Sequence, residues 1–299
     1  MSSKERAQKN DFLSPLLVGC CRLIPSRSRK FFFTTAALVY YYFFPRHRLL
    51  ALYNLQTSFP EKAKAEIAAL AKEVYRNAAI VGAELFDIPS LNKDNIKDWV
   101  EVEGLENYHQ ALEKGRGAIL ISAHFGNWEL SAAALPFLRQ PIVPVYRPLD
   151  NALLDNIILR IRSATGNVPL SKTRALRQML RHLKNNMILG LLIDQNVARQ
   201  EGVFVDYFSR PACTTDSAAQ LALRTKAPVL PLFNLRLPNG KYRLILGKEL
   251  PLVETGDWDG DVLVNTQNYT RVIEEMVRKH PDHWLWVHHR WKTKAWQNN

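Results

Sequence analysis

Short apolar runs that alternate with amphipathic segments constrain most strongly how this chain can fold. Four runs have the length and composition of buried strands, and they occupy residues 118–122, 142–145, 187–193 and 229–237. Helical spacing marks the segments around them, at 105–114, 128–138, 153–162, 174–184 and 217–226. Strands that alternate with helices predict βαβ units. We therefore expect an α/β fold with a mostly parallel central sheet flanked by helices.

The remaining segments complete this expected domain. Residues 242–246 follow a Pro-Asn-Gly turn at 238–240 and predict an antiparallel neighbour for 229–237. Upstream, the run from Ser58 to Glu61 has the pattern of a capping box at the start of a helix that stops before Pro89. Residues 267–279 predict a closing helix. We expect two regions, an N-terminal helical segment at 1–53 and an α/β domain at 54–299.

The most apolar part of the expected N-terminal segment is FFFTTAALVYYYFF at 31–44, fourteen residues without a charge and with basic residues on both sides. A membrane-spanning helix needs about 20 apolar residues. Aromatic side chains flanked by Lys and Arg favour the lipid headgroup layer. With the apolar stretch at 12–24, this predicts a membrane-associating helical extension, and the alternative is a pair of core helices.

The charge of the chain indicates what kind of partner it binds, and its cysteines indicate the redox compartment. The net charge is +12, and the basic residues cluster before residue 60, at 139–184 and at 288–294. Such a balance predicts an anionic partner. Because the first cluster flanks apolar sequence, an anionic membrane surface is a better partner than nucleic acid. The three cysteines have no metal-binding or redox spacing, which fits a reducing compartment.

Candidate catalytic residues follow the predicted strands, at the edge where open parallel sheets bind ligands. His124 follows the first strand, Arg147 the second and Asp194 the third. Glu129 lies five residues after His124, so a histidine in the turn and a glutamate in the helix can converge. A carboxylate on one imidazole nitrogen leaves the other free to accept a proton. This pair predicts a general base for an alcohol or water; a structural histidine is the alternative.

Other kinds of site find no support in the sequence. It has no GxSxG elbow, HExxH, P-loop or strand-linked GxGxxG motif. The acidic run Asp257-Trp-Asp-Gly-Asp261 has Val262 and Asn268 where an EF-hand needs glycine and glutamate. We therefore expect a solvated loop there, no metal site and no cofactor.

The string HFGNWE at 124–129 matches the H-x-x-x-x-[DE] block of glycerolipid and lipid A acyltransferases. More specifically, the chain resembles the bacterial lipid A biosynthesis acyltransferases, the lauroyl and myristoyl transferase family. The supporting motifs occur in order along the chain: NLQTSFPE at 54–61, VYRPLDN at 145–151, ILRIRSATGN at 158–167, IDQN at 193–196, GVFVDYF at 202–208 and PDHWLWVHHRWKT at 281–293. Ser209 stands near a position where the family pattern leads us to expect glycine.

The resemblance implies acyl transfer from an acyl carrier protein thioester, or from coenzyme A, to a hydroxyl of a lipid A precursor. This acceptor places the enzyme on the cytoplasmic face of the inner membrane. In this reading His124 is the base, Glu129 holds its imidazole, and no acyl-enzyme forms. The family's motifs also imply substrate-binding roles for four residues: Asn127, Arg147, Arg162 and Asp194. Asp194 has a second possible role, which is to orient His124 or an arginine.

Three alternatives remain open at this stage. The acceptor could be another membrane lipid, such as a phosphatidylinositol mannoside or a lysophospholipid. The protein could be an esterase or thioesterase in which His124 activates water. It could also be a non-catalytic adaptor at the membrane surface. For Arg147 and Arg162, the alternative to anion binding is a structural ion pair with a nearby aspartate.

Overall fold

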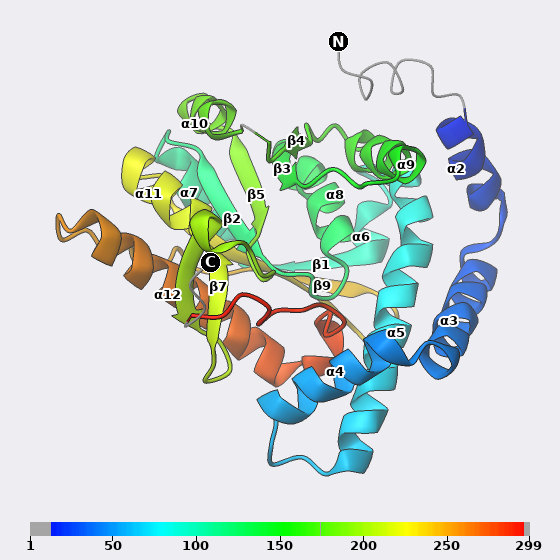
Figure 1. Ribbon diagram of the computed structural model, residues 1–299. Coiled ribbons are helices and arrows are strands. Elements are labelled where there is room, and N and C mark those ends of the chain that lie inside the picture. The colour runs from blue at the N-terminus through cyan, green and yellow to red at the C-terminus, as the bar shows by residue number, and fades with distance from the viewer. Residues whose placement is uncertain (1–12, 174, 296–299) are drawn as a thin grey trace.

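The computed structural model describes residues 13–173 and 175–295 (Figure 1). Phe12 and Arg174, which begin two of the expected helical segments, lie outside these residues. The helices are α2 (Leu13–Leu23), α3 (Ser26–Phe43), α4 (Pro45–Ser58), α5 (Lys64–Glu84), α6 (Ile96–Trp99), α7 (Leu105–Glu113), α8 (Trp128–Leu138), α9 (Ala152–Ser163), α10 (Leu176–Lys184), α11 (Ser217–Thr225) and α12 (Trp258–Lys279), with 3-10 turns η1 (Leu85–Ser90), η2 (Arg199–Glu201) and η3 (Pro281–His283). The strands are β1 (Val100–Glu103), β2 (Ala118–Ser122), β3 (Ile142–Tyr146), β4 (Leu170–Ser171), β5 (Ile188–Leu192), β6 (Gly202–Asp206), β7 (Pro211–Thr215), β8 (Val229–Arg236) and β9 (Tyr242–Leu246).

The central sheet has seven strands in the order β1-β9-β8-β2-β5-β3-β4. All neighbouring pairs are parallel except β8 and β9, which pair antiparallel across the Pro-Asn-Gly turn. The predicted α/β fold with a mostly parallel sheet is therefore confirmed. Strands β6 and β7 form a separate antiparallel hairpin that the sequence patterns do not reveal.

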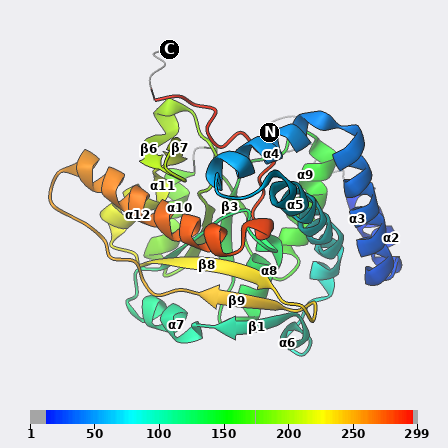
Figure 2. The ribbon, with the colours of Figure 1, turned by 90° about the horizontal axis from the view of Figure 1, so that it is seen from below.

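Helices cover both faces of the sheet, because alternate strand residues point to opposite sides. Ile119 and Ile121 of β2 pack in one core with α4, α5 and α10 to α12. Leu120, between them in sequence, packs in a second core with α7, α8 and α9. Figure 2 shows these layers edge-on, with α12 on one side of β8 and β9 and with α6 and α7 on the other. Two buried faces explain why the strands read as continuous apolar runs.

The N-terminal helices α3 and α4 pack along α5, and α2 packs against α9 and η1 (Figure 1). The expected boundary at residues 53 and 54 falls inside α4. At the α2–α3 turn, the buried Arg29 guanidinium donates to the Ala83 carbonyl and pairs with Asp87. Tyr41 and Val18 are buried, yet most other large apolar side chains of α2 and α3 are exposed. None of the described helices combines the length and hydropathy that crossing a membrane requires.

Three local expectations differ from the structure. The capping box predicted at 58–61 is wrong: Ser58 ends α4, and α5 begins at Lys64, where the Glu66 carboxylate accepts from the Ala63 N–H at 2.9 Å. Helix α12 begins nine residues before the expected closing helix, at Trp258. Its first turn contains the acidic run, so this run is not the solvated loop we expected.

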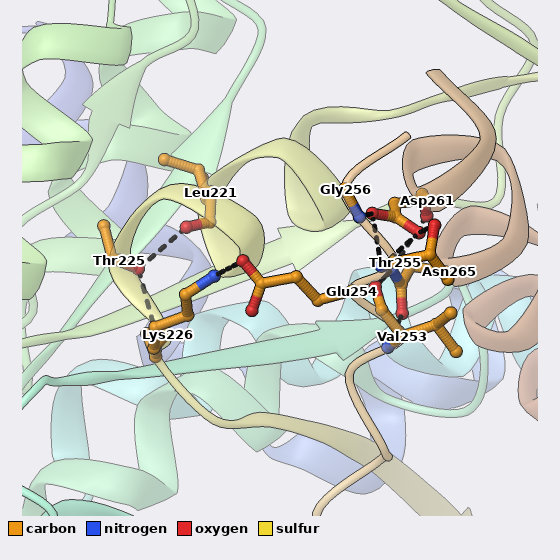
Figure 3. A network of polar contacts seen from close by, with 10 residues as sticks. Leu221, Thr225, Lys226, Val253, Glu254, Thr255, Gly256, Asp261 and Asn265 are labelled. Atoms are coloured by element: carbon orange, nitrogen blue, oxygen red, sulfur yellow. Dashed lines mark hydrogen bonds and ion pairs between the residues drawn. The ribbon is translucent and has the colours of Figure 1, made fainter. Parts of the chain in front are cut away.

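The acidic run forms the start of α12 and ties it to the preceding loop. The Asp257 side chain caps the helix by accepting from the Gly260 N–H. The buried Asp261 carboxylate accepts from the N–H and hydroxyl of Thr255 and from the Gly256 N–H, and the Asn265 amide bonds both backbone groups of Val253 (Figure 3). Asp257 therefore caps α12, and Asp261 fixes the loop that precedes it.

Candidate active site

A histidine and an aspartate meet where two neighbouring parallel strands end. Strands β2 and β5 are paired so that Ser122 lies opposite Leu192, which brings the following turns together. The Asp194 Oδ1 atom lies 2.9 Å from His124 Nδ1, and its Oδ2 atom accepts the His124 backbone N–H at 2.9 Å. One carboxylate therefore fixes both the ring and the backbone of the histidine.

The charges of the two side chains shift each other's pKa and keep the Asp194 carboxylate ionised. Burial raises the pKa of Asp194, but the charge and hydrogen bond of His124 outweigh it and hold the pKa well below its usual range. Burial likewise lowers the pKa of His124, but the Asp194 carboxylate raises it above its ordinary value. Because Asp194 is ionised, Nδ1 carries the ring proton of the neutral imidazole. The other nitrogen, Nε2, is then the proton acceptor.

The Nε2 side of the imidazole faces the accessible part of the site. The His124 side chain keeps 20% of its exposure, whereas the Asp194 side chain keeps none. The amide nitrogen of Gln195 lies 3.5 Å from Nε2. The Trp128 ring contacts the imidazole edge-on, with 5.1 Å between centroids. A basic nitrogen thus points toward the solvent-facing side while its partner carboxylate is buried.

Glu129 does not hold the imidazole, contrary to the sequence-based expectation. Its carboxylate accepts from Arg162 at two points, with Nε to Oε2 at 2.9 Å and Nη2 to Oε1 at 2.5 Å. The Trp128 indole N–H also donates to Oε1 at 3.1 Å. Glu129 lies on the first turn of α8, so its side chain leaves the turn that carries His124 and meets α9 instead.

The same bonds assign Arg162 a different position from the one expected. Its side chain keeps only 20% exposure and forms a two-point pair with Glu129, so it is not an arginine open to a substrate anion. Arg162 thus pairs with Glu129 and not with a nearby aspartate, which was the structural alternative that we considered. Burial lowers the pKa of Arg162, but the hydrogen bond and charge of Glu129 outweigh burial and raise the pKa above its ordinary value. The guanidinium therefore stays charged.

The Asn127 side chain does not fit the substrate-binding role expected for it. It is 1% exposed and caps α8, because its Oδ1 accepts the Leu130 N–H at 2.9 Å. Its Nδ2 donates at 2.8 Å to Glu84, a buried carboxylate of α5 that also accepts from Tyr242 and pairs with Lys30 of α3. Asn127 therefore fixes the start of the helix instead of contacting ligand.

Arg147 lies at the carboxyl edge of the sheet and is open to solvent. It follows β3, its side chain keeps 72% exposure, and its contact with Asp150 is a solvent-exposed one at 3.6 Å. Since Tyr146 pairs with Ser171 in the β3–β4 register, the next residues, Arg147 and Lys172, are neighbours. Lys172 has an exposed contact of its own, with Glu201 at 3.4 Å. Such exposed ion pairs contribute little energy, so these two cations remain accessible to an anionic ligand.

A C-terminal segment completes the site, and the sequence patterns did not identify its role. Trp284 forms an antiparallel bridge with Phe125, and the Leu285 N–H donates to the His124 carbonyl at 3.1 Å. The Gly126 N–H donates to the His283 carbonyl at 2.8 Å, so the turn that carries His124 is bonded to this segment on both sides. The only sequence feature that points to this segment is the family motif at 281–293, and that motif does not predict the contact with His124.

The chain is similar in sequence to known acyltransferases over most of its length. The family model of the bacterial lipid A biosynthesis acyltransferases matches residues 7–293. A lipid A biosynthesis lauroyltransferase from Escherichia coli (strain K12) is 30% identical over 248 residues, which cover 81% of this chain and 78% of the relative. A palmitoleoyltransferase of the same pathway and organism is 25% identical over 251 residues, 83% and 80% of the two chains.

Among solved structures, the 1-acyl-sn-glycerophosphate acyltransferase PlsC from Thermotoga maritima is more remotely similar, with a TM-score of 0.41 and 17% identity over 88% of this chain and 99% of the other. The family match extends from before α2 to the C-terminal segment that contacts His124. It includes every residue of the site described above. This chain belongs to the bacterial lipid A biosynthesis acyltransferases, a family of enzymes that transfer acyl groups to a membrane lipid.

Proposed function

We propose that this enzyme transfers a fatty acyl chain from an acyl carrier protein thioester to a hydroxyl of a lipid A precursor, with His124 as general base. The observation that carries the proposal is the imidazole fixed at Nδ1 by the buried Asp194, with Nε2 on the accessible side. The family match supplies the class of reaction. The sequence-based pairing of His124 with Glu129 is replaced by the pairing with Asp194.

The proposed reaction needs one proton transfer in each direction. As the acceptor oxygen attacks the thioester carbonyl, its proton moves to Nε2 of His124. The oxygen–carbon bond forms and the carbonyl oxygen becomes an oxyanion. The oxyanion then collapses, the carbon–sulfur bond breaks, and the departing thiolate takes the proton from Nε2. Asp194 stabilises the imidazolium between the two transfers, and no acyl-enzyme forms.

The start of α8 is the proposed stabiliser of the oxyanion. The first N–H groups of a helix have no partner within the helix, and this end carries a partial positive charge. Asn127 caps one of them, the N–H of Leu130, which leaves those of Trp128 and Glu129 at the mouth of the turn. The Glu129–Arg162 pair fixes this first turn against α9. Its role in the proposal is to hold the helix in position.

Anionic parts of the substrates have two candidate contact regions. Arg147 and Lys172 are proposed to bind phosphate groups of the acceptor, because arginine binds phosphate at two points and both side chains lie at the rim. The carrier protein is acidic, and the basic face of α10 with exposed Arg177, Arg181 and Lys184 is its proposed contact. A coenzyme A thioester remains the alternative donor.

The N-terminal helices are the proposed contact with the membrane. Fifteen of the 22 large apolar side chains that are exposed in the described residues lie between Leu13 and Tyr53. On α3, Phe31 and Phe32 are each more than 60% exposed. An exposed aromatic face next to basic residues suits the interfacial layer of an anionic leaflet. We place the enzyme on the cytoplasmic face of the inner membrane, where acyl thioesters are available.

The test is mass spectrometry of the lipid products. The purified protein is incubated with lauroyl-acyl carrier protein and a lipid A precursor in mixed micelles, and a product heavier by one acyl chain is expected. His124→Ala is the control, and it must lose this product. Transfer only to a phosphatidylinositol mannoside or a lysophospholipid would show that the proposed acceptor is wrong and that this lipid is the acceptor. Release of free fatty acid in place of transfer would favour a thioesterase, and acyl protein that survives denaturation would refute direct transfer.

A further inference from the structure

The Asp194 carboxylate receives a third hydrogen bond from outside the two strand ends. The indole N–H of Trp284 donates to Oδ2 at 2.8 Å, the same oxygen that accepts the His124 backbone N–H. Trp284 is 1% exposed and Asp194 is 2% exposed, so this bond is shielded from water. A bond from a neutral donor to a buried carboxylate is stronger than a bond between two neutral groups.

Trp284 also contacts the other member of the pair through its backbone. The stretch at 283–285 lies alongside the turn at 124–126, joined by the Phe125–Trp284 bridge and by bonds from the Leu285 and Gly126 N–H groups. One residue therefore bonds the buried carboxylate with its side chain and borders the His124 turn with its main chain. Figure 1 shows this red C-terminal segment crossing the region below the end of β2.

The packing around Trp284 holds the indole in one orientation. Its ring contacts Trp286 edge-on at 4.6 Å, Tyr207 at 5.5 Å and His288 at 4.9 Å between centroids. The charged and titratable groups that face the His124–Asp194 pair are Glu129, Arg162, Tyr207, His288 and Arg290. Burial lowers the pKa of His288 below its ordinary value, and its Nδ1 lies 2.6 Å from the Leu285 carbonyl.

We propose that Trp284 is a positioning residue for the catalytic base. Its indole N–H holds Oδ2 of Asp194, so that Oδ1 remains directed at Nδ1 of His124 and the ring keeps Nε2 as its acceptor. Without this donor the carboxylate can rotate about its Cβ–Cγ bond and lose its alignment with Nδ1. The inference rests on the proposed function, because it assigns a role in the orientation of the same base.

Trp286 offers a matched control two residues away. It is fully buried, and its indole N–H donates to the Pro281 carbonyl at 2.7 Å instead of to a catalytic carboxylate. Phenylalanine at either position removes one buried N–H donor and a similar volume, and at position 286 it keeps an aromatic ring against the Trp284 indole. We expect Trp284→Phe to lower kcat about tenfold to hundredfold with KM unchanged, the factor that a bond to a charged group carries. We expect Trp286→Phe to lower the Tm similarly with kcat within about threefold, since its bond is to a neutral carbonyl.

A double-mutant cycle tests whether Trp284 acts through Asp194. If it does, Trp284→Phe has little further effect on kcat in an Asp194→Asn background, whereas independent effects would multiply. Replacement of Trp284 by β-(3-benzothienyl)alanine keeps the ring shape without the N–H, and it should reproduce the loss of kcat if the phenylalanine variant does not fold.

Two results would overturn the positioning role. The first is an equal loss of kcat in the Trp284 and Trp286 variants, in proportion to their loss of Tm. The second is a benzothienyl variant with the wild-type kcat. Failure of the underlying mechanism gives a different result, because Asp194→Asn would then retain full activity. All rates are measured with the full-length protein, lauroyl-acyl carrier protein and a lipid A precursor.

Discussion

Replacement of Asp194 by asparagine is the most direct test of the proposed base, because the structure predicts how the amide would orient. Oδ2 of Asp194 accepts two N–H groups, from the His124 backbone and the Trp284 indole. The single carbonyl oxygen of asparagine must take this place, since an amide nitrogen there would face two donors. The amide nitrogen then faces Nδ1 of His124 and donates to it. The ring proton moves to Nε2, and the base is blocked.

The expected magnitude follows from this change of tautomer. A positioned general base contributes about 10²–10⁴-fold, and the corresponding change in a serine protease triad costs about 10⁴-fold. We expect Asp194→Asn to lower kcat about 10³–10⁴-fold, close to His124→Ala. KM should change little, because the carboxylate is buried. Single-turnover acyl transfer followed by mass spectrometry measures the chemical step. Asp206→Asn makes the same chemical change at the exposed last residue of β6 and is the matched control.

The pH dependence provides an independent measurement of the same pair. The base must be neutral, and the Asp194 carboxylate raises the pKa of His124 above its ordinary value of 6.5. The rate should therefore fall as the pH drops through a midpoint above 6.5 in the wild-type protein. In Asp194→Asn this raising influence is absent, so the midpoint of the residual activity should move to lower pH. A variant with more than a tenth of the wild-type kcat and an unshifted midpoint would refute the proposed base.

The remaining predictions concern the groups around the base. Arg162→Lys keeps the charge but loses the two-point bond, so kcat should fall about tenfold with an unchanged pH midpoint; a full rate in the transfer assay would contradict this. Glu84→Gln should lower the free energy of unfolding in urea by about 1–3 kcal/mol, because a buried ion pair loses its charge, and an unchanged value would refute it. Phe32→Glu should weaken sedimentation with anionic vesicles at unchanged Tm, and equal binding would argue against the α3 surface. Arg147→Ala should raise the KM for a bisphosphorylated acceptor about tenfold but not that for the monophosphorylated form; parallel changes would exclude a phosphate contact.

Much of the fold follows from the sequence, because buried parallel strands and amphipathic helices leave distinct periodic patterns. The four apolar runs that we expected to be strands are β2, β3, β5 and β8, and the antiparallel partner of β8 is β9. The patterns failed where elements are short or half-exposed. Strand β4 has two residues, and β6 and β7 lie outside the central sheet. The wrong capping box shows a related limit: Ser58 has the right local sequence, but the helix preceding it continues through this position.

For the site, the sequence determined which side chains reach the carboxyl edge of the sheet. His124, Arg147 and Asp194 directly follow strand-forming runs, and this alone places them at one edge. The pairing among them was decided by the tertiary structure. His124 meets Asp194, seventy residues away, because β2 and β5 are neighbours in the sheet, whereas Glu129, five residues away, turns with α8 toward Arg162. Strand order and helix direction depend on how the whole chain packs. A local motif therefore identifies the candidate site residues but does not determine which of them are in contact.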